Sequence, residues 1–192
     1  KGGLIYFKTS GSTAELKASS LKWGLADEVD EWDWTTPQGD PLVLFEIRFA
    51  AFHNSKLFIV SSPTIKDASK IEEQFEAGDQ RSCYLPCPHC DERQTLKWSN
   101  LRWTANAHRV TRAWYVCEHC GCEIEEYNKS AMLASHRWVA ANPGAMYRSY
   151  RINGLYTPIG LGRSWLQLAQ EWIEAQGDPR KLVVFVNTRL AE

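Results

Sequence analysis

The stretch Leu57-Phe58-Ile59-Val60, followed by Ser61-Ser62-Pro63-Thr64, is the strongest indicator of the fold class of this chain. Four consecutive apolar residues that stop at small polar ones are typical of a strand buried in a parallel sheet. Two more strands are expected upstream, a short buried one over residues 4–7 and a second one over residues 21–26. Because strands and helices alternate up to residue 80, the pattern predicts an α/β layer with parallel strands.

Two helix patterns separate or follow these strands. Asp40-Pro41 is typical of a helix start, with aspartate as the N-cap and proline at the first helical position. This helix is expected to bury Leu44, Phe45 and Phe52. Residues 66–77 form an amphipathic pattern that ends at Gly78, a common residue at the carboxyl end of helices. Both helices fit the α/β alternation.

A run of acidic residues follows the strand at 21–26. In nucleotide-hydrolysing P-loop proteins, an aspartate at a strand's carboxyl end, as Asp27 is, helps hold Mg²⁺. A neighbouring carboxylate, here Glu28, can orient or deprotonate water for attack on the γ-phosphate. A solvated acidic loop is the alternative, because such clusters are commonly exposed. Lys22 and Gly24 interrupt the strand, so both interpretations stay open at this point.

Small hydroxyl residues end the strand at 57–60. In motor ATPases, the strand beside the acidic one often ends in such residues, which sense the phosphate and relay its loss. Ser61, Ser62 and Thr64 fit this role, and they also fit a simple helix N-cap. The two roles are compatible.

All six cysteines lie within residues 81–126, where short aromatic runs and turn residues indicate a small β module. Cys87-Pro88-His89-Cys90 and Cys117-Glu118-His119-Cys120 are two C-x-x-C knuckles. Thiolates at Cys87, Cys90, Cys117 and Cys120 would fit the corners of a tetrahedron around Zn²⁺, with hairpin strands between them as in a zinc ribbon. A closed site of four cysteines has no open position, so this zinc is expected to be structural.

Disulfides and a thioredoxin-like redox pair are the alternatives for these knuckles. Disulfides fit poorly in a chain without a secretory signal, and redox motifs do not come in matched pairs. Gly121 suits a left-handed turn after the second knuckle, and Asp91 is a tolerable substitute after the first. Cys83 and Cys122 are expected to be buried thiols outside the site.

The same module carries tryptophans beside arginines. Such side chains could contact a phosphate backbone, or the tryptophans could form the module's own core, and the sequence leaves both open. The residues are Trp98, Arg102, Trp103, Arg112 and Trp114.

Residues 127–192 are expected to be mainly helical. One short helix should end near His136. Ser164 and Gln167 form a capping box at the start of another helix, and Asp178-Pro179 predicts a further helix start.

Composition limits the class of protein. Hydrophobic residues make up 44% of the 192 residues and charged residues 23%, which excludes a collagen-like or disordered chain, and no apolar run reaches membrane-spanning length. The net charge is -1, but the charges are unevenly distributed. Residues 27–46 contain aspartates and glutamates and no lysine or arginine, whereas residues 93–116 contain lysines and arginines and no acidic residue. This polarity suggests that the protein handles polyanions locally.

A set of short motifs occurs in order along the chain. Besides the two knuckles these are Asp27-Glu28-Val29-Asp30, Gly39-Asp40-Pro41, Ser61-Ser62-Pro63-Thr64, Gly78-Asp79-Gln80-Arg81, Asn153-Gly154-Leu155-Tyr156 and Phe185-Val186-Asn187-Thr188. Each motif is common alone. The ordered set resembles the GpA-type large terminase subunit of tailed double-stranded DNA bacteriophages, over nearly the whole chain.

The resemblance implies a DNA-packaging motor that binds and hydrolyses ATP with Mg²⁺ and is joined to a metal-dependent endonuclease. By this likeness Asp27 is the Mg²⁺-binding Walker B residue and Glu28 the catalytic carboxylate. Ser61, Ser62 and Thr64 form the coupling motif that links hydrolysis to DNA movement. Viral double-stranded DNA, the small terminase subunit and the portal are the implied partners, in the cytoplasm of the bacterial host and without a membrane.

The likeness also implies three regions. Residues 1–80 are expected to be the carboxyl-terminal half of a P-loop-type parallel-sheet ATPase core, residues 81–126 the zinc ribbon, and residues 127–192 a helical linker leading to a nuclease domain beyond the chain. The chain has no G-x-x-x-x-G-K-[S/T] phosphate loop, so alone it is expected not to hydrolyse ATP. The alternative function is a non-catalytic zinc-ribbon module that binds DNA or a packaging partner. A degenerate prophage remnant is a third interpretation.

Overall fold

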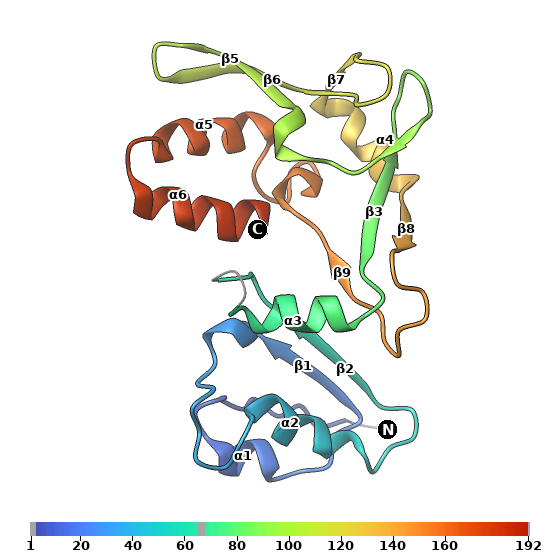
Figure 1. Cartoon of the computed structure of the whole chain (residues 1–192), viewed down its shortest axis with the longest axis vertical. Helices are drawn as coiled ribbons and strands as arrows, with labels where there is room; N and C mark the ends of the chain where they lie inside the picture. Colours follow the sequence, from blue (N-terminus) through green and yellow to red (C-terminus); the bar gives the residue numbers. More distant parts are fainter. Residues whose placement is uncertain (1–2, 65–67, 192) are drawn as a thin grey trace. The chain divides into compact units, whose positions relative to one another are not determined.

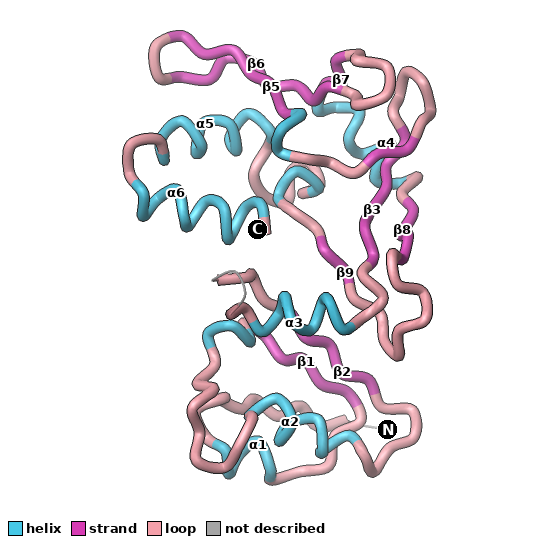
Figure 2. The backbone as a smooth tube through the Cα atoms, in the orientation of Figure 1, coloured by secondary structure: helices cyan, strands magenta, loops and turns pink. Residues whose placement is uncertain are grey.

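The computed structural model describes residues 3–64 and 68–191. The chain divides into two compact units, residues 1–62 and residues 63–192 (Figure 1). Among the described residues, the first unit contains one sheet and the second contains two. Figure 2 shows helices and strands in the same chain, and the strands form both parallel and antiparallel pairs, so the chain is a mixed α/β protein, as expected.

The first unit is built on a parallel pair of strands, β1 (Trp23–Asp27) and β2 (Lys56–Val60). Their register runs from Trp23 opposite Lys56 to Asp27 opposite Val60, so both strands end at one edge. The predicted parallel pairing is therefore confirmed. The expected burial is not observed throughout, because Phe58 is 59% exposed.

Two helices belong to this unit, α1 (Thr13–Lys17) and α2 (Pro41–Glu46). The predicted helix start is confirmed, because the Asp40 carboxylate accepts hydrogen bonds from the backbone N–H groups of Leu42 and Val43. Phe45 is buried as expected, whereas Phe52 lies beyond the helix and is exposed.

The strand expected at residues 4–7 is wrong. These residues form no strand, and Phe7 is 94% exposed. In the described part of the first unit the only ladder is that of β1 with β2, so this apolar run has no pairing partner. A short run without backbone partners gains neither ladder hydrogen bonds nor burial, and its side chains stay exposed to solvent.

The second unit begins with helix α3 (Lys70–Ala77), which Ser69 caps through a hydrogen bond from the Glu72 N–H. It starts later than the sequence pattern predicts, and residues 66–67 of the predicted helix lie outside the described residues. Gly78 is its carboxyl-terminal cap, in an extended conformation.

Strand β3 (Arg81–Pro86) is the centre of the first sheet of this unit. It pairs antiparallel with β4 (Arg93–Gln94) and β8 (Arg137–Ala140), and parallel with β9 (Tyr150–Arg151). Because β8 and β9 lie beyond residue 126, strands of the cysteine-rich segment share a sheet with the chain that follows it.

A separate antiparallel sheet is formed by β5 (Leu101–Asn106), β6 (Arg109–Val116) and β7 (Glu123–Glu125). The hairpin of β5 and β6 occupies the chain between the two knuckles, as predicted.

The remaining helices are α4 (Lys129–Ala134), α5 (Trp165–Ala175) and α6 (Pro179–Phe185). All three predicted helices are confirmed. The capping box is present, because the Ser164 hydroxyl accepts from the Gln167 N–H while the Gln167 side chain accepts from the Ser164 N–H. Short helical turns complete the chain: η1 (Val29–Glu31), η2 (Ile47–Phe49), η3 (Trp98–Asn100), η4 (Glu126–Asn128), η5 (Gly154–Tyr156) and the π-helical η6 (Val186–Leu190).

One hydrophobic core joins the cysteine-rich strands to helix α5. Leu85 and Tyr115 of the strands and Trp165 and Leu168 of the helix are all fully or almost fully buried in this core. The cysteine-rich segment therefore does not pack as a separate body within the second unit.

Among the residues that the structure describes, none of the helices combines the length and apolar character needed to cross a membrane.

Candidate functional site

The first candidate site lies at the edge where β1 and β2 end. Asp27 is the last residue of β1 and pairs with Val60, the last residue of β2. The acidic turn and the Ser61-Ser62 segment therefore leave the sheet side by side. They also touch, because the backbone N–H of Asp30 donates a hydrogen bond to the Ser61 hydroxyl oxygen over 3.2 Å. The structure thus brings together two segments that the sequence separates by about thirty positions.

Glu28 occupies an unusual backbone conformation. Its φ of 49° lies in the left-handed region, which few residues other than glycine adopt. The Asp27 carboxylate accepts a hydrogen bond from the Glu28 N–H, and the Glu28 carbonyl accepts one from the Glu31 N–H at 2.9 Å. Both Asp27 and Glu28 are exposed. Backbone strain of this kind concentrates at functional sites.

Two indole groups hold the acidic turn. Trp32 Nε1 donates to the carbonyl oxygen of Asp27 over 2.9 Å, and Trp34 Nε1 donates to that of Val29 over 3.0 Å. Val29 is fully buried beneath the turn. The backbone is therefore anchored from inside while the carboxylates of Asp27 and Glu28 remain accessible to a ligand.

The hydroxyl residues after β2 have different surroundings. Ser61 accepts the bond from Asp30 and also contacts the carbonyl oxygen of Ser62 at 3.2 Å. Thr64 belongs to the second unit, where its carbonyl oxygen accepts a hydrogen bond from Asn187 Nδ2 at 2.7 Å. The coupling role stays a prediction.

The second candidate site is a cluster of four cysteine sulfurs. Cys87, Cys90, Cys117 and Cys120 place their Sγ atoms within 4.8 Å of one another, which is an arrangement that can hold a metal ion. The Sγ atoms of Cys87 and Cys120 are 3.9 Å apart, and those of Cys90 and Cys117 are also 3.9 Å apart. A tetrahedron with metal–sulfur bonds of about 2.3 Å has edges of about 3.8 Å, so the four residues fit such an ion.

The two knuckles repeat the same local structure. In each, the first cysteine's carbonyl accepts a hydrogen bond of 3.0 Å from the residue just after the knuckle, Asp91 or Gly121. Both of these residues have positive φ, 61° and 70°, as the sequence predicts. Each imidazole contacts the strand that follows the other knuckle: His89 Nε2 lies 3.0 Å from the Glu123 carbonyl oxygen in β7, and His119 Nε2 lies 3.2 Å from that of Arg93 in β4.

The thiols differ in how readily they ionise. Burial raises the pKa of Cys87 to about 12. At the exposed side of the cluster the backbone N–H of Cys122 lowers the pKa of Cys120 to about 6.

Of the two remaining cysteines, Cys83 is buried as expected. The expectation for Cys122 is wrong, because its turn faces solvent and the residue is exposed.

Most of the tryptophans near the knuckles belong to the core. The ring of Trp98 lies 5.7 Å from that of Trp103, 5.4 Å from Trp172 and 5.1 Å from Phe185, measured between centroids. Arg112 forms ion pairs with Glu123 and Glu125 and covers the ring of Trp114. These contacts favour the core interpretation over phosphate binding by this group.

Comparison with known proteins places the chain in a family. A model of the family described as phage terminase large subunit gpA, ATPase domain, matches residues 1–138. The chain belongs to the family of gpA-type phage terminase large subunits. A second model, terminase large subunit gpA, endonuclease domain, matches residues 147–192. This terminase chain thus resembles an endonuclease domain within the region that we expected only to lead to one, and the domain boundaries stay a prediction.

Two curated relatives of this terminase chain are both named terminase, large subunit. The one from Enterobacteria phage P21 is 29% identical over 181 residues, which cover 81% of this chain and 27% of the relative. The one from Escherichia phage lambda is 25% identical over 191 residues, covering 86% of this chain and 29% of the relative. The chain therefore spans little more than a quarter of these relatives. No solved structure matches it.

Proposed function

We propose that this terminase chain supplies the Walker B edge and the coupling segment of an ATPase that moves viral DNA into procapsids. Asp27 holds Mg²⁺, Glu28 acts on the attacking water, and Ser61, Ser62 and Thr64 respond to the phosphate. ATP and Mg²⁺ are the cofactors of the complete enzyme, whose endonuclease cuts the DNA. This follows the family match and the names of the relatives.

One observation supports the proposal most directly. Asp27 and Val60 are paired at the ends of parallel strands, and the Asp30 N–H contacts the Ser61 hydroxyl just beyond that edge. Ligands of open α/β sheets bind beyond the carboxyl ends of the strands. Loss of the γ-phosphate beside the carboxylates can therefore reach the β2 segment through one hydrogen bond. The left-handed backbone conformation of Glu28 fixes the direction in which its side chain leaves the end of β1.

The four-cysteine cluster is proposed to hold structural Zn²⁺. Cys87, Cys90, Cys117 and Cys120 use all four positions of a tetrahedral ion, so no position remains for water or substrate. The role proposed for the zinc is to fix the two knuckles and thereby the hairpin that packs on α5.

Double-stranded viral DNA, a small terminase subunit and a portal are the proposed partners, in the host cytoplasm.

The proposal is tested by ATP turnover of a polypeptide that carries this sequence together with a phosphate loop. Glu28→Gln should abolish Mg²⁺-dependent hydrolysis while nucleotide binding persists. Glu31→Gln, an exposed acid of the same turn, is the matched control and should retain hydrolysis. Hydrolysis that survives in Glu28→Gln and fails in Glu31→Gln would overturn the assignment of the catalytic carboxylate.

The 192-residue chain alone is proposed to lack ATP turnover, because its sequence contains no G-x-x-x-x-G-K-[S/T] motif. Metal-dependent turnover by this chain that Glu28→Ala removes would contradict the proposal. A non-catalytic binding module remains the alternative, and the match of an ATPase model to residues 1–138 gives it no added support.

A further inference from the structure

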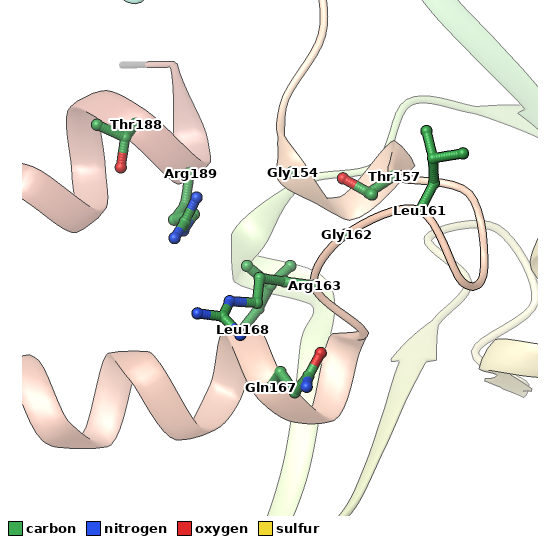
Figure 3. Close-up of a pocket in the computed structure, with 9 residues that line it drawn as sticks. All are labelled: Gly154, Thr157, Leu161, Gly162, Arg163, Gln167, Leu168, Thr188 and Arg189. Carbon is green, nitrogen blue, oxygen red and sulfur yellow. The ribbon is translucent and has the colours of Figure 1, made fainter.

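A cavity of about 500 Å³ lies in the second unit beside the start of helix α5 (Figure 3). Helix α5, the turn η5 with the loop after it, and the π-helical turn η6 all contribute side chains to its wall. The polar residues that line it are Thr157, Arg163, Gln167, Thr188 and Arg189. None of these residues has a part in the ATPase edge or the cysteine cluster.

Two arginines of this cavity share one carboxylate. Arg163 Nε lies 2.6 Å from Glu171 Oε1, and Arg189 Nε lies 2.8 Å from Glu171 Oε2. Glu171 is therefore bound on both oxygens, and the three side chains together carry one net positive charge. Figure 3 shows the two guanidinium groups extending toward each other across the cavity. The Arg163 and Arg189 side chains are 51% and 37% exposed, so a ligand can reach them.

The two guanidinium groups and the Gln167 amide offer free hydrogen-bond donors to this cavity. Both arginines use Nε for Glu171, and within the described part of the chain their terminal nitrogens have no hydrogen-bond partner. Gln167 accepts from the Ser164 N–H on Oε1 at 2.9 Å, so its Nε2 amide group is the donor that remains. Guanidinium groups with several free N–H groups are suited to oxyanions, above all to phosphate.

A backbone contact positions Arg189. A Cβ atom built on Gly154 would lie 2.9 Å from the Arg189 carbonyl oxygen, so η5 and η6 approach closely here because residue 154 is glycine. The two arginines are thus brought together by the tertiary structure from positions before α5 and after α6.

A smaller and more apolar cavity, of about 270 Å³, shares Arg163 with the first. Tyr127, Pro158 and Ile159 line it, and Tyr127 is 75% exposed. Its one acid, Glu126, is already bonded to the buried Lys129 ammonium and to the Trp165 N–H. An aromatic surface next to a cationic one is the arrangement that single-stranded nucleic acids bind, by stacking and by phosphate contact.

We propose that Arg163 and Arg189, with Gln167, form a phosphate-binding site, and that its phosphate comes from the backbone of a DNA strand. The identity of that strand as packaged DNA rests on the proposed function. The phosphate site itself does not, because it is argued from the geometry of this cavity.

The test is the binding of a short fluorescein-labelled single-stranded oligonucleotide to the full 192-residue chain, followed by fluorescence anisotropy over a series of salt concentrations. Arg163→Gln and Arg189→Gln should each weaken binding by roughly tenfold, since each removes a charged hydrogen bond. The slope of log affinity against log salt should become shallower by about one for each arginine removed. Arg180→Gln, an exposed arginine on α6 outside the cavity, should bind as the unaltered chain does.

Glu171→Gln separates binding from structure. It removes the negative charge that the arginines share, so it should tighten oligonucleotide binding, whereas damage to a purely structural ion pair would weaken it. Thermal unfolding of every variant checks that the chain is folded. Folded Arg163→Gln and Arg189→Gln proteins that bind like Arg180→Gln would overturn the proposal, and so would weaker binding by folded Glu171→Gln.

Unlabelled ATP and inorganic phosphate, added as competitors, identify the source of the phosphate. Displacement by excess oligonucleotide but not by ATP at the same phosphate concentration supports a DNA strand. Equal displacement by ATP would overturn the strand assignment in favour of a free nucleotide. This experiment does not measure ATP turnover. Failure of the ATPase proposal would appear in the turnover assay, whereas failure of the phosphate site would appear in the binding assay, so the two failures are distinguishable.

Discussion

The hydroxyl of Tyr156 donates a hydrogen bond to the carbonyl oxygen of Cys83 over 2.7 Å. It also accepts one from the backbone N–H of Leu96, again over 2.7 Å. The ring is buried, and burial raises the pKa of Tyr156. Cys83 precedes the first knuckle and Leu96 follows it, so one phenol from η5 ties the base of the knuckle to the helical part of the second unit.

Removing this hydroxyl should therefore destabilise the whole second unit. Tyr156→Phe leaves two buried backbone groups without this partner, and we expect it to lower the free energy of unfolding by about 1–3 kcal/mol. Denaturant unfolding followed by tryptophan fluorescence measures the change. Tyr127→Phe, at an exposed tyrosine, is the matched control and should have almost no effect. Equal stabilities of the two variants would show that the Tyr156 hydrogen bonds contribute nothing net.

The cysteine cluster predicts which thiols keep the metal. Cys117→Ser should lose the proposed Zn²⁺ and lower the midpoint of thermal unfolding, because it removes one of the four thiolates of the proposed tetrahedral site. Cys122→Ser, at an exposed cysteine outside the cluster, should retain one zinc per chain. Metal content by mass spectrometry and a melting curve before and after chelation make the comparison. Full zinc content in Cys117→Ser would contradict the proposed ligand set.

The lowered pKa of the Asp79 carboxyl predicts how the stability of the protein depends on pH. Burial acts to raise the pKa of Asp79, but the Ser149 N–H at 3.0 Å and the Arg81 guanidinium at 2.7 Å outweigh it and hold the pKa below its usual range. A carboxylate with a lowered folded-state pKa stabilises the protein above its unfolded pKa of about 4, and this contribution disappears as pH falls through the folded pKa.

The measurement compares unaltered protein with Asp79→Asn over a series of pH values. The difference in free energy of unfolding should be constant near neutral pH and should shrink only below about pH 4. Glu76→Gln, at an exposed residue of α3, should show a much smaller difference at every pH. A difference for Asp79→Asn that grows as the solution is acidified would have the wrong sign for this explanation.

The close approach at Gly154 predicts that one substitution there lowers both the stability of the protein and its affinity for the oligonucleotide. In Gly154→Ala the new methyl group meets the Arg189 carbonyl oxygen at 2.9 Å, so backbone must shift, at a cost of about 1–3 kcal/mol. We expect lower stability together with weaker oligonucleotide binding, because Arg189 moves. Gly144→Ala adds a methyl group in open space and should change neither quantity. Reduced stability with unchanged binding would show that the position of Arg189 does not matter for the ligand.

The sequence predicts several local features correctly, because each depends on residues only a few positions apart. The N-cap bonds of Asp40, the capping box at Ser164 and the helix start at Asp178 are of this kind. So are the left-handed turns at Asp91 and Gly121. The parallel pair is predictable as well, because the alternation of strand and helix patterns up to residue 80 favours parallel strands.

Burial and proximity across the chain are different, because they depend on which distant surface covers a residue. Residues 4–7 are apolar but lack a pairing strand, and Cys122 resembles Cys83 in sequence yet faces solvent. No local pattern places Arg163 and Arg189 on one carboxylate, that of Glu171. Their meeting requires α5 and α6 to fold back on each other, which is a property of the packed unit and not of any short segment.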